Sequence, residues 1–195
     1  MAVSTRPYHH GNLRPALLEA AERALASGRE LSLREIAREV GVSHAAPRRH
    51  FADKQALLDA LAADGFERLG SEMARAVADA GQSFPGRLTA LARTYVRFAT
   101  EHAALLELMY AGKHGSEALH EAADRAFAAP LTMMAEAQAA GEIVDGDVLS
   151  VAAVPWACFH GLASMANGGI LGDEAPLDAL VDVAVERLID GLRPR

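Results

Sequence analysis

Basic side chains are concentrated in one short segment near position 50 of this 195-residue chain. His44, Arg48, Arg49 and His50 lie within seven residues, and no acidic residue separates them. Guanidinium groups bind phosphates and pair with the acceptor edge of guanine, and double-stranded DNA offers both contacts. The alternative is a helix face that is merely solvated, because the polar face of a surface helix normally faces water. The segments on either side distinguish the two.

Two short helices joined by a tight turn are predicted to position this segment, over about residues 32–50. Ser32 can accept a hydrogen bond from the backbone N–H of Glu35, and Glu35 can reach back to that of Ser32. Gly41 ends the first helix, because glycine adopts the left-handed conformation without a Cβ clash, and Ser43 can cap the second. A helix, a glycine turn and a short basic helix form the layout of a helix-turn-helix.

The segment Ser43–Lys54, with the sequence SHAAPRRHFADK, resembles the signature of the TetR family of bacterial transcriptional regulators. The resemblance runs from about Tyr8 to Leu69 and includes the lead-in YHHGNLR at positions 8–14. The family usually has a tyrosine, which typically contacts the DNA backbone, where this chain has Arg48. An arginine can reach a phosphate or a guanine edge, so both roles stay open for Arg48.

The residues expected to contact DNA lie on the two short helices or at the start of the next helix. They are Ser32, Ser43, His44, Ala45, Ala46, Arg48, Arg49, His50 and Lys54. Arg48 and Arg49 are the strongest candidates for a guanine, whereas Ser32 and Lys54 are expected to contact phosphates. Pro47 falls in the first turn of the second helix, where proline is tolerated but can forfeit one hydrogen bond.

The charge is distributed unevenly along the chain. The net charge is -7, but residues 1–54 hold nine Lys and Arg against six acids, and the remainder holds ten against twenty. A basic head on an acidic body is typical of a DNA-binding protein with a separate second domain. The single Cys158 excludes an internal disulfide, and no apolar secretory signal follows Met1. We therefore expect a cytoplasmic protein.

The predicted fold is all-α, with about nine helices. Alanine, leucine, glutamate and arginine are abundant, and 51% of the residues are hydrophobic, which suffices for a sizeable core. Residues 8–69 should form an N-terminal three-helix helix-turn-helix domain that binds DNA. Residues 85–193 should form a C-terminal helical bundle for ligand binding and dimerisation. A break over Gly81–Gly86 separates them.

The last two predicted helices, Val148–Asn167 and Leu177–Leu192, are expected to form a homodimer interface. Val148–Gly172 carries no charge and is long enough to span a membrane, but it is only weakly apolar and is interrupted by polar residues. A buried helix at a subunit interface is therefore favoured over a membrane span. Trp156 with His160-Gly161 also resembles the tryptophan/histidine-glycine subgroup of TetR C-terminal domains.

The C-terminal domain is expected to hold a pocket for a small, largely apolar effector of unknown identity. The candidates are adaptable apolar residues and residues with a polar tip: Tyr95, Phe98, Leu106, Met109, Tyr110, Phe127, Met134, Trp156, Phe159 and His160. The alternative for any one of them is ordinary core packing. The His120–Asp124 segment superficially resembles a zinc-binding helix motif, but it lacks the second histidine and is interpreted as a solvated face.

These features together predict a DNA-binding transcriptional regulator and not an enzyme, with no metal and no cofactor. Such a protein would repress transcription by binding a palindromic operator as a homodimer, and the apolar ligand would release it. Two alternatives stay open. One is a helical dimeric adaptor or small-molecule-binding protein that does not bind DNA. The other is an enzyme using His160 and Cys158, which lie two residues apart and so do not share a helix face.

Overall fold

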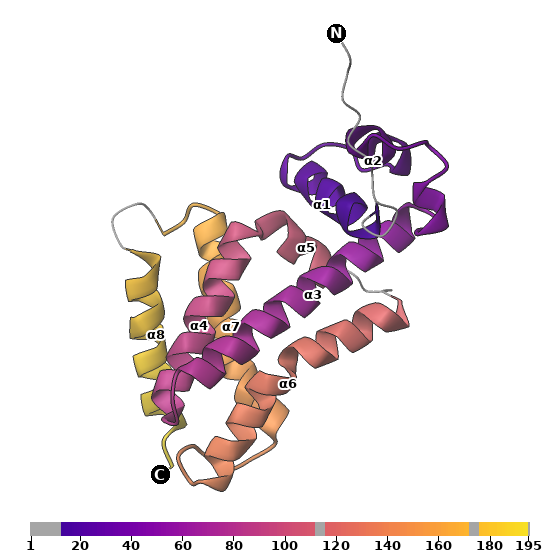
Figure 1. The fold of residues 1–195 in the computed structure, drawn as a ribbon. Coiled ribbons are helices and arrows are strands. Elements are labelled where there is room, and N and C mark those ends of the chain that lie inside the picture. Colours follow the sequence, from indigo (N-terminus) through magenta and orange to yellow (C-terminus); the bar gives the residue numbers. More distant parts are fainter. Residues whose placement is uncertain (1–12, 112–115, 172–175, 195) are drawn as a thin grey trace. The chain divides into compact units, whose positions relative to one another are not determined.

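The computed structural model describes residues 13–111, 116–171 and 176–194, and every regular element in this part of the chain is helical (Figure 1). This confirms the predicted fold class. In chain order the elements are α1 (Leu13–Ala26), α2 (Leu33–Val40), the 3₁₀ helix η2 (Pro47–Arg49), α3 (Lys54–Asp79), α4 (Phe84–Glu101), α5 (Ala103–Ala111), α6 (Glu117–Ala139), α7 (Val148–Asn167) and α8 (Leu177–Leu192). The chain forms two compact units, Met1–Ala62 and Ala63–Arg195, so their boundary falls inside α3.

The first unit is built from α1, α2, η2 and the first residues of α3. Its core contains Leu17, Ile36, Phe51 and Leu57, each almost completely buried. The Ser32 side chain accepts a hydrogen bond of 3.2 Å from the N–H of Glu35, which confirms the predicted cap of α2. The Glu35 carboxylate lies 3.8 Å from Arg38.

Gly41 ends α2 in the left-handed conformation, with φ of 77°. The N–H of Val42 donates to the carbonyl of Ala37 at 2.9 Å, and the N–H of Gly41 donates to the carbonyl of Arg38 at 3.2 Å. This pair of hydrogen bonds is a Schellman motif, which favours glycine at position 41 because a Cβ penalises the left-handed conformation. The predicted turn after α2 is therefore confirmed.

The predicted second helix of the helix-turn-helix is wrong in its detail. The segment forms only a short 3₁₀ helix, and Ser43 does not cap it, because Ala46 occupies the cap position without a side-chain hydrogen bond. Had Ser43 capped an α-helix, the first i to i−4 hydrogen bond would have required the N–H of Pro47. Proline has no N–H, so tighter bonds form instead, from Ala46 to the carbonyl of Ser43 and from Arg49 to that of Ala46.

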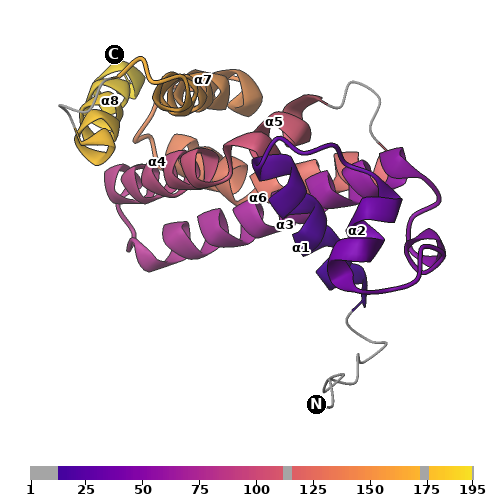
Figure 2. The ribbon, with the colours of Figure 1, turned by 90° about the horizontal axis from the view of Figure 1, so that it is seen from above.

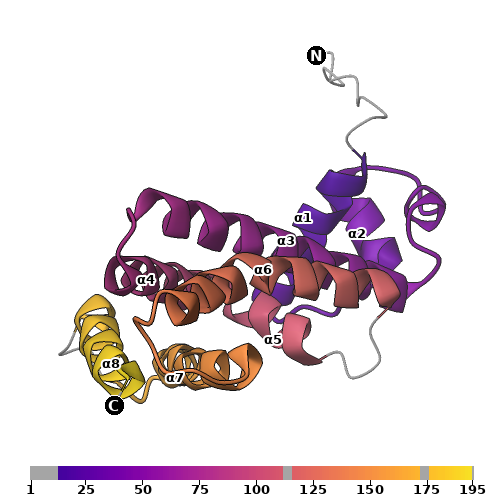
Figure 3. The same ribbon diagram turned by 90° about the horizontal axis from the view of Figure 1, so that it is seen from below.

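The second unit is centred on α4, which buries side chains along much of its length. Helices α5, α6, α7 and α8 all pack against α4, and α7 also packs against α8. Figures 2 and 3 show α7 and α8 next to each other on one side of α4. The predicted bounds of α7 and α8 are confirmed, and α6 continues through Pro130 without interruption.

Candidate DNA interface and ligand pocket

The basic segment around η2 lies on the surface of the first unit. His44, Arg48, Arg49 and His50 are exposed, whereas Pro47 between them is buried. The proline thus anchors the turn in the core while the basic side chains project outward. Since the segment lacks a regular α-helix, its side chains do not follow the spacing of a helix face.

The remaining residues predicted to contact DNA are also accessible. Ser43, Ala45 and Lys54 are exposed, and Ser32 and Ala46 are half-buried. Lys54 begins α3, and this end of the helix is capped by Asp53, whose carboxylate accepts a hydrogen bond of 2.8 Å from the N–H of Ala56.

Phe51 connects the basic turn to α3. Its ring is 3% exposed, and the guanidinium of Arg14 on α1 lies over it, 5.7 Å from the ring centroid. A cation at this distance is attracted by the ring face. Phe51 therefore fixes the path of the chain between the exposed arginines and Lys54.

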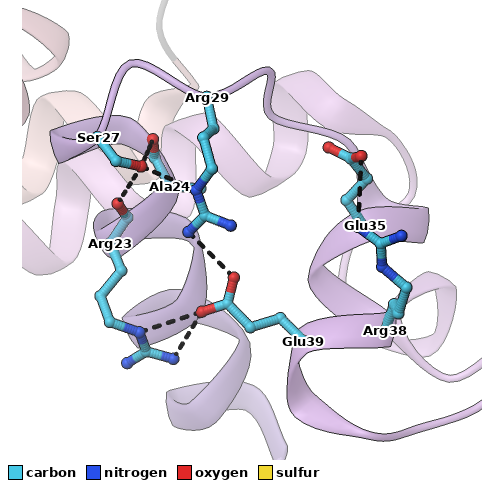
Figure 4. Close-up of polar contacts among 7 residues, drawn as sticks. All are labelled: Arg23, Ala24, Ser27, Arg29, Glu35, Arg38 and Glu39. Carbon is cyan, nitrogen blue, oxygen red and sulfur yellow. Dashed lines mark hydrogen bonds and ion pairs between the residues drawn. The ribbon is translucent and has the colours of Figure 1, made fainter.

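An ion-pair cluster joins α1 to α2 in the same unit (Figure 4). The carboxylate of Glu39 accepts hydrogen bonds from Arg23 at 3.1 Å and from Arg29 at 3.2 Å. Burial alone would raise the pKa of Glu39, but these hydrogen bonds and the two positive charges lower it below its usual range. The cluster holds α2 against α1, and α2 leads directly into the basic turn.

Replacing Glu39 with glutamine should lower the stability of the first unit by less than about 1 kcal/mol near neutral pH, because the arginines of the cluster are exposed. The folded-state pKa of Glu39 is depressed, so its contribution exists above the unfolded value of about 4.5 and is lost as the pH falls through the folded value. Hydrogen exchange of α1 and α2 amides from pH 7 to pH 3 measures this.

Glu19→Gln is the matched control, since Glu19 is an exposed acid on α1. A difference between wild type and Glu39→Gln that persists unchanged at the lowest pH would contradict the assignment.

The second unit contains a cavity of about 620 Å³ between α4, α6 and α7. This volume lies in the range typical of small-molecule sites. Almost the whole wall is apolar, and it is formed by Leu88, Leu91, Ala123, Asp124, Phe127, Ala128, Pro130, Leu131, Met134, Leu149, Ala152, Ala153, Pro155, Trp156 and Phe159. The exposed residues Asp124, Ala128, Leu149 and Ala153 show that the cavity opens to solvent.

Four of the ten residues predicted to bind a ligand line this cavity: Phe127, Met134, Trp156 and Phe159. Phe127 and Trp156 meet edge to face, with ring centroids 4.4 Å apart and an angle of 86° between the rings. The other six lie outside its wall. Of these, Tyr95, Phe98, Leu106 and Met109 are buried in the core, Tyr110 is 41% exposed, and His160 is half-buried.

Tyr95, Tyr110 and His160 form a polar cluster next to Trp156. The hydroxyl of Tyr95 lies 2.8 Å from Nδ1 of His160, and the Tyr95 and Trp156 rings are 4.3 Å apart. Burial raises the pKa of Tyr95 to about 12, and partial burial beside Tyr95 raises the pKa of Tyr110. Both phenols are therefore neutral at physiological pH, and the cluster supplies hydrogen bonds but no negative charge.

Eleven of the fifteen wall residues were not predicted from the sequence: four leucines, four alanines, two prolines and Asp124. Ala123, Ala152 and Ala153 give no sign of a pocket, because alanine is common in any helix. Asp124 was interpreted as part of a solvated face; it is exposed, and it also forms part of the cavity wall. Its position three residues before Phe127, which puts both on one helix face, is a signal that could have found it.

A helix-turn-helix unit with an exposed basic turn and a separate helical unit with an apolar cavity define a class of DNA-binding regulators. Residues 17–61 match the family profile described as "Bacterial regulatory proteins, tetR family", and residues 88–188 match "Tetracyclin repressor-like, C-terminal domain". The second match spans more than half of the chain. The chain belongs to the TetR family.

Solved structures have a similar fold. A protein of unknown function from Rhodococcus sp. RHA1 is 47% identical, with a TM-score of 0.89 over 97% of this chain and 100% of that one. A TetR family transcription regulator from Marinobacter aquaeolei VT8 is 19% identical, with a TM-score of 0.76 over 93% and 96% of the two chains. FadR from Bacillus subtilis, solved in complex with stearoyl-CoA, is 16% identical, with a TM-score of 0.70 over 92% and 99%. None of the curated proteins compared matches the chain.

Proposed function

We propose that this DNA-binding regulator is a repressor that binds a palindromic operator as a homodimer and is released by a small, largely apolar ligand. The observation that carries the proposal is the exposed basic turn around η2, built on a capped and ion-paired α2. The proposed limits of the two functional domains are 8–69 and 85–193. Membership of the tryptophan/histidine-glycine subgroup stays a prediction.

Arg48 and Arg49 are proposed to contact base edges, and Lys54 a phosphate. The two arginines are exposed next to the buried Pro47, which places them on a fixed turn and not on a flexible loop. Guanidinium groups on a fixed backbone can discriminate guanine from other bases, whereas a lysine at the start of α3 acts as a point charge. Ser32, Ser43, His44, Ala45, Ala46 and His50 complete the proposed contact surface.

The cavity is proposed as the effector site, with Phe127, Met134, Trp156 and Phe159 in direct contact with the ligand. The other six predicted residues would support this wall from behind and would not contact the ligand directly. Helix α3 begins in the unit that carries the basic turn and continues in the unit that carries the cavity, so it is the proposed connection between the two sites. Coupling is reciprocal, so a ligand that weakens operator binding must itself bind more weakly to the DNA-bound protein.

A homodimer is proposed because α7 and α8 leave large apolar side chains exposed within one subunit. Val154 and Val183, which lie outside the cavity wall, are each more than half exposed. By length and composition alone α7 could cross a membrane, but one such helix is weak evidence, and a second subunit would cover the same face. We therefore propose that the protein acts on DNA in the cytoplasm.

Selection of bound sequences from a random DNA pool, followed by anisotropy titration at several salt concentrations, tests the proposal. Arg48→Ala and Arg49→Ala should change the preferred bases, at a cost of about 1–3 kcal/mol for each lost base contact. Lys54→Ala should weaken all sequences alike, because phosphate contacts carry no direct sequence information. If both arginine variants selected the same sequences as wild type, base readout would have to be assigned to His44 or to DNA shape.

The selection also separates the alternatives. An adaptor, or a small-molecule-binding protein without a DNA site, would give no sequence-selective and salt-dependent binding. An enzyme using Cys158 is disfavoured on chemical grounds, because burial raises the pKa of the Cys158 thiol and keeps it protonated at neutral pH. The family and the fold are likewise those of transcription regulators.

A further inference from the structure

The charge on the cavity wall is of one sign. Asp124 is the only charged side chain among the described residues that form the wall. Phe127 and Ala128 lie three and four residues later on α6, so the carboxylate stands within one helical turn of the aromatic part of the cavity. Asp124 is exposed, which places it where the cavity meets solvent.

The two arginines that directly adjoin wall residues in the sequence form ion pairs with carboxylates outside the wall. Arg125, next to Asp124, pairs with Glu67 at 3.4 Å and with Glu121 at 3.5 Å. Arg87, which precedes the wall residue Leu88, pairs with Glu136 at 2.8 Å. Both guanidinium groups are thus held by other carboxylates, and no cation lies among the described wall residues to neutralise Asp124.

Two aromatic rings of the wall also favour a cation over an anion. Trp156 and Phe127 contact each other edge to face, and both line the cavity. The negative face of an aromatic ring attracts a cation, and tryptophan does so most strongly. An anion would meet the Asp124 carboxylate without any compensating positive charge, and repulsion and desolvation would both disfavour it.

We infer that the cavity selects lipophilic cations, with the apolar part of the ligand against the alanine and leucine wall and the ammonium group between Asp124 and the two rings. This inference rests on the proposed function, since it takes the cavity as the effector site. Asp124 then sets the charge of the ligand. Fatty acids and other lipophilic anions should bind more weakly than cations of the same chain length.

Three ten-carbon probes that differ only in their head group test the inference: decylamine, 1-decanol and decanoate, each below its micelle-forming concentration. Trp156 is the single tryptophan and lies in the cavity wall, so its fluorescence reports binding. The titrations are made at pH 8, where an amine like that of lysine, with a pKa of about 10.4, stays protonated.

Wild type should bind decylamine about 3- to 10-fold more tightly than decanol, and decanoate most weakly, because the carboxylate is exposed and its interaction is partly screened. Asp124→Asn should remove the preference for decylamine over decanol. Glu117→Gln is the matched control: it removes the same charge from an exposed position of the same helix, outside the cavity wall, and should keep the preference.

Equal binding of all three probes, tighter binding of decanoate, or an unchanged preference in Asp124→Asn would each overturn the inference, as would the absence of any binding. Operator affinity, measured in parallel with the bound probe, tests the proposed function separately. A probe that occupies the cavity and leaves operator affinity unchanged counts against effector release. It does not count against charge selection.

Discussion

Replacing Gly70 with alanine is expected to lower the free energy of unfolding by about 1–3 kcal/mol. Gly70 lies on α3 where this helix meets α6, and a Cβ atom at this position would stand 2.6 Å from the Cα of Ala126. Real Cβ atoms essentially never approach other heavy atoms so closely. Because the opposing atom belongs to the backbone, α6 as a whole would have to move.

The usual effect of this substitution has the opposite sign. Alanine is favoured over glycine in a helix by about 1 kcal/mol, so the clash must exceed this gain before any loss is measured. Gly191→Ala is the matched control, because Gly191 lies within α8 and a Cβ there would have nothing within 4 Å. Urea unfolding followed by circular dichroism and Trp156 fluorescence should show a loss for Gly70→Ala and none for Gly191→Ala. Equal stability of the two variants would refute the close approach.

Replacing Gly161 with glutamate is expected to convert the proposed dimer to a monomer and to weaken operator binding by about 100-fold or more, since a monomer engages only one half-site. Gly161 lies on α7, and a Cβ there would have nothing within 4 Å inside the subunit. A disruptive effect would therefore come from a second subunit and not from an internal clash. Val154 lies seven residues earlier, on the same helix face, and is 58% exposed.

Sedimentation measures the oligomeric state of this variant, and circular dichroism shows whether the monomer remains folded. Ala74→Glu, which adds the same charge at an exposed position of α3, should stay dimeric and bind the operator like wild type. A Gly161→Glu protein that remains dimeric would exclude this face from the interface. Tight binding of a palindrome by a monomeric wild type would refute the dimer model altogether.

Helix bounds were predictable where a local signal sets them. α7 and α8 begin and end at the predicted residues, and the Ser32 cap and the Gly41 turn form as expected, because each depends on a few neighbouring residues. The segment after Gly41 has equally good helix signals, but Pro47 stands at the position where the first N–H donor is needed. The backbone N–H that Pro47 lacks therefore matters more than the helix-favouring Ser43 cap and the two alanines, Ala45 and Ala46.

The cavity was harder to predict, because its wall depends on packing between distant segments. Tyr95 and Trp156 are both aromatic and their tilted rings lie 4.3 Å apart, yet only Trp156 lines the cavity. A side chain's type does not reveal on which side of such a contact the empty space lies. That space arises where α4, α6 and α7 meet with small side chains, and one sequence does not show which helices meet.

The alanines of the cavity wall have an evolutionary consequence. Ala123, Ala128, Ala152 and Ala153 lie on helices, where exchange for leucine or methionine keeps a high helix propensity. Each exchange would fill part of the cavity with atoms that need no hydrogen-bond partner. Single mutations at these positions would therefore change the size of molecule that fits the cavity at little cost in stability. If the cavity is the effector site, as proposed, such a wall would let ligand specificity diverge while the helical framework stays the same.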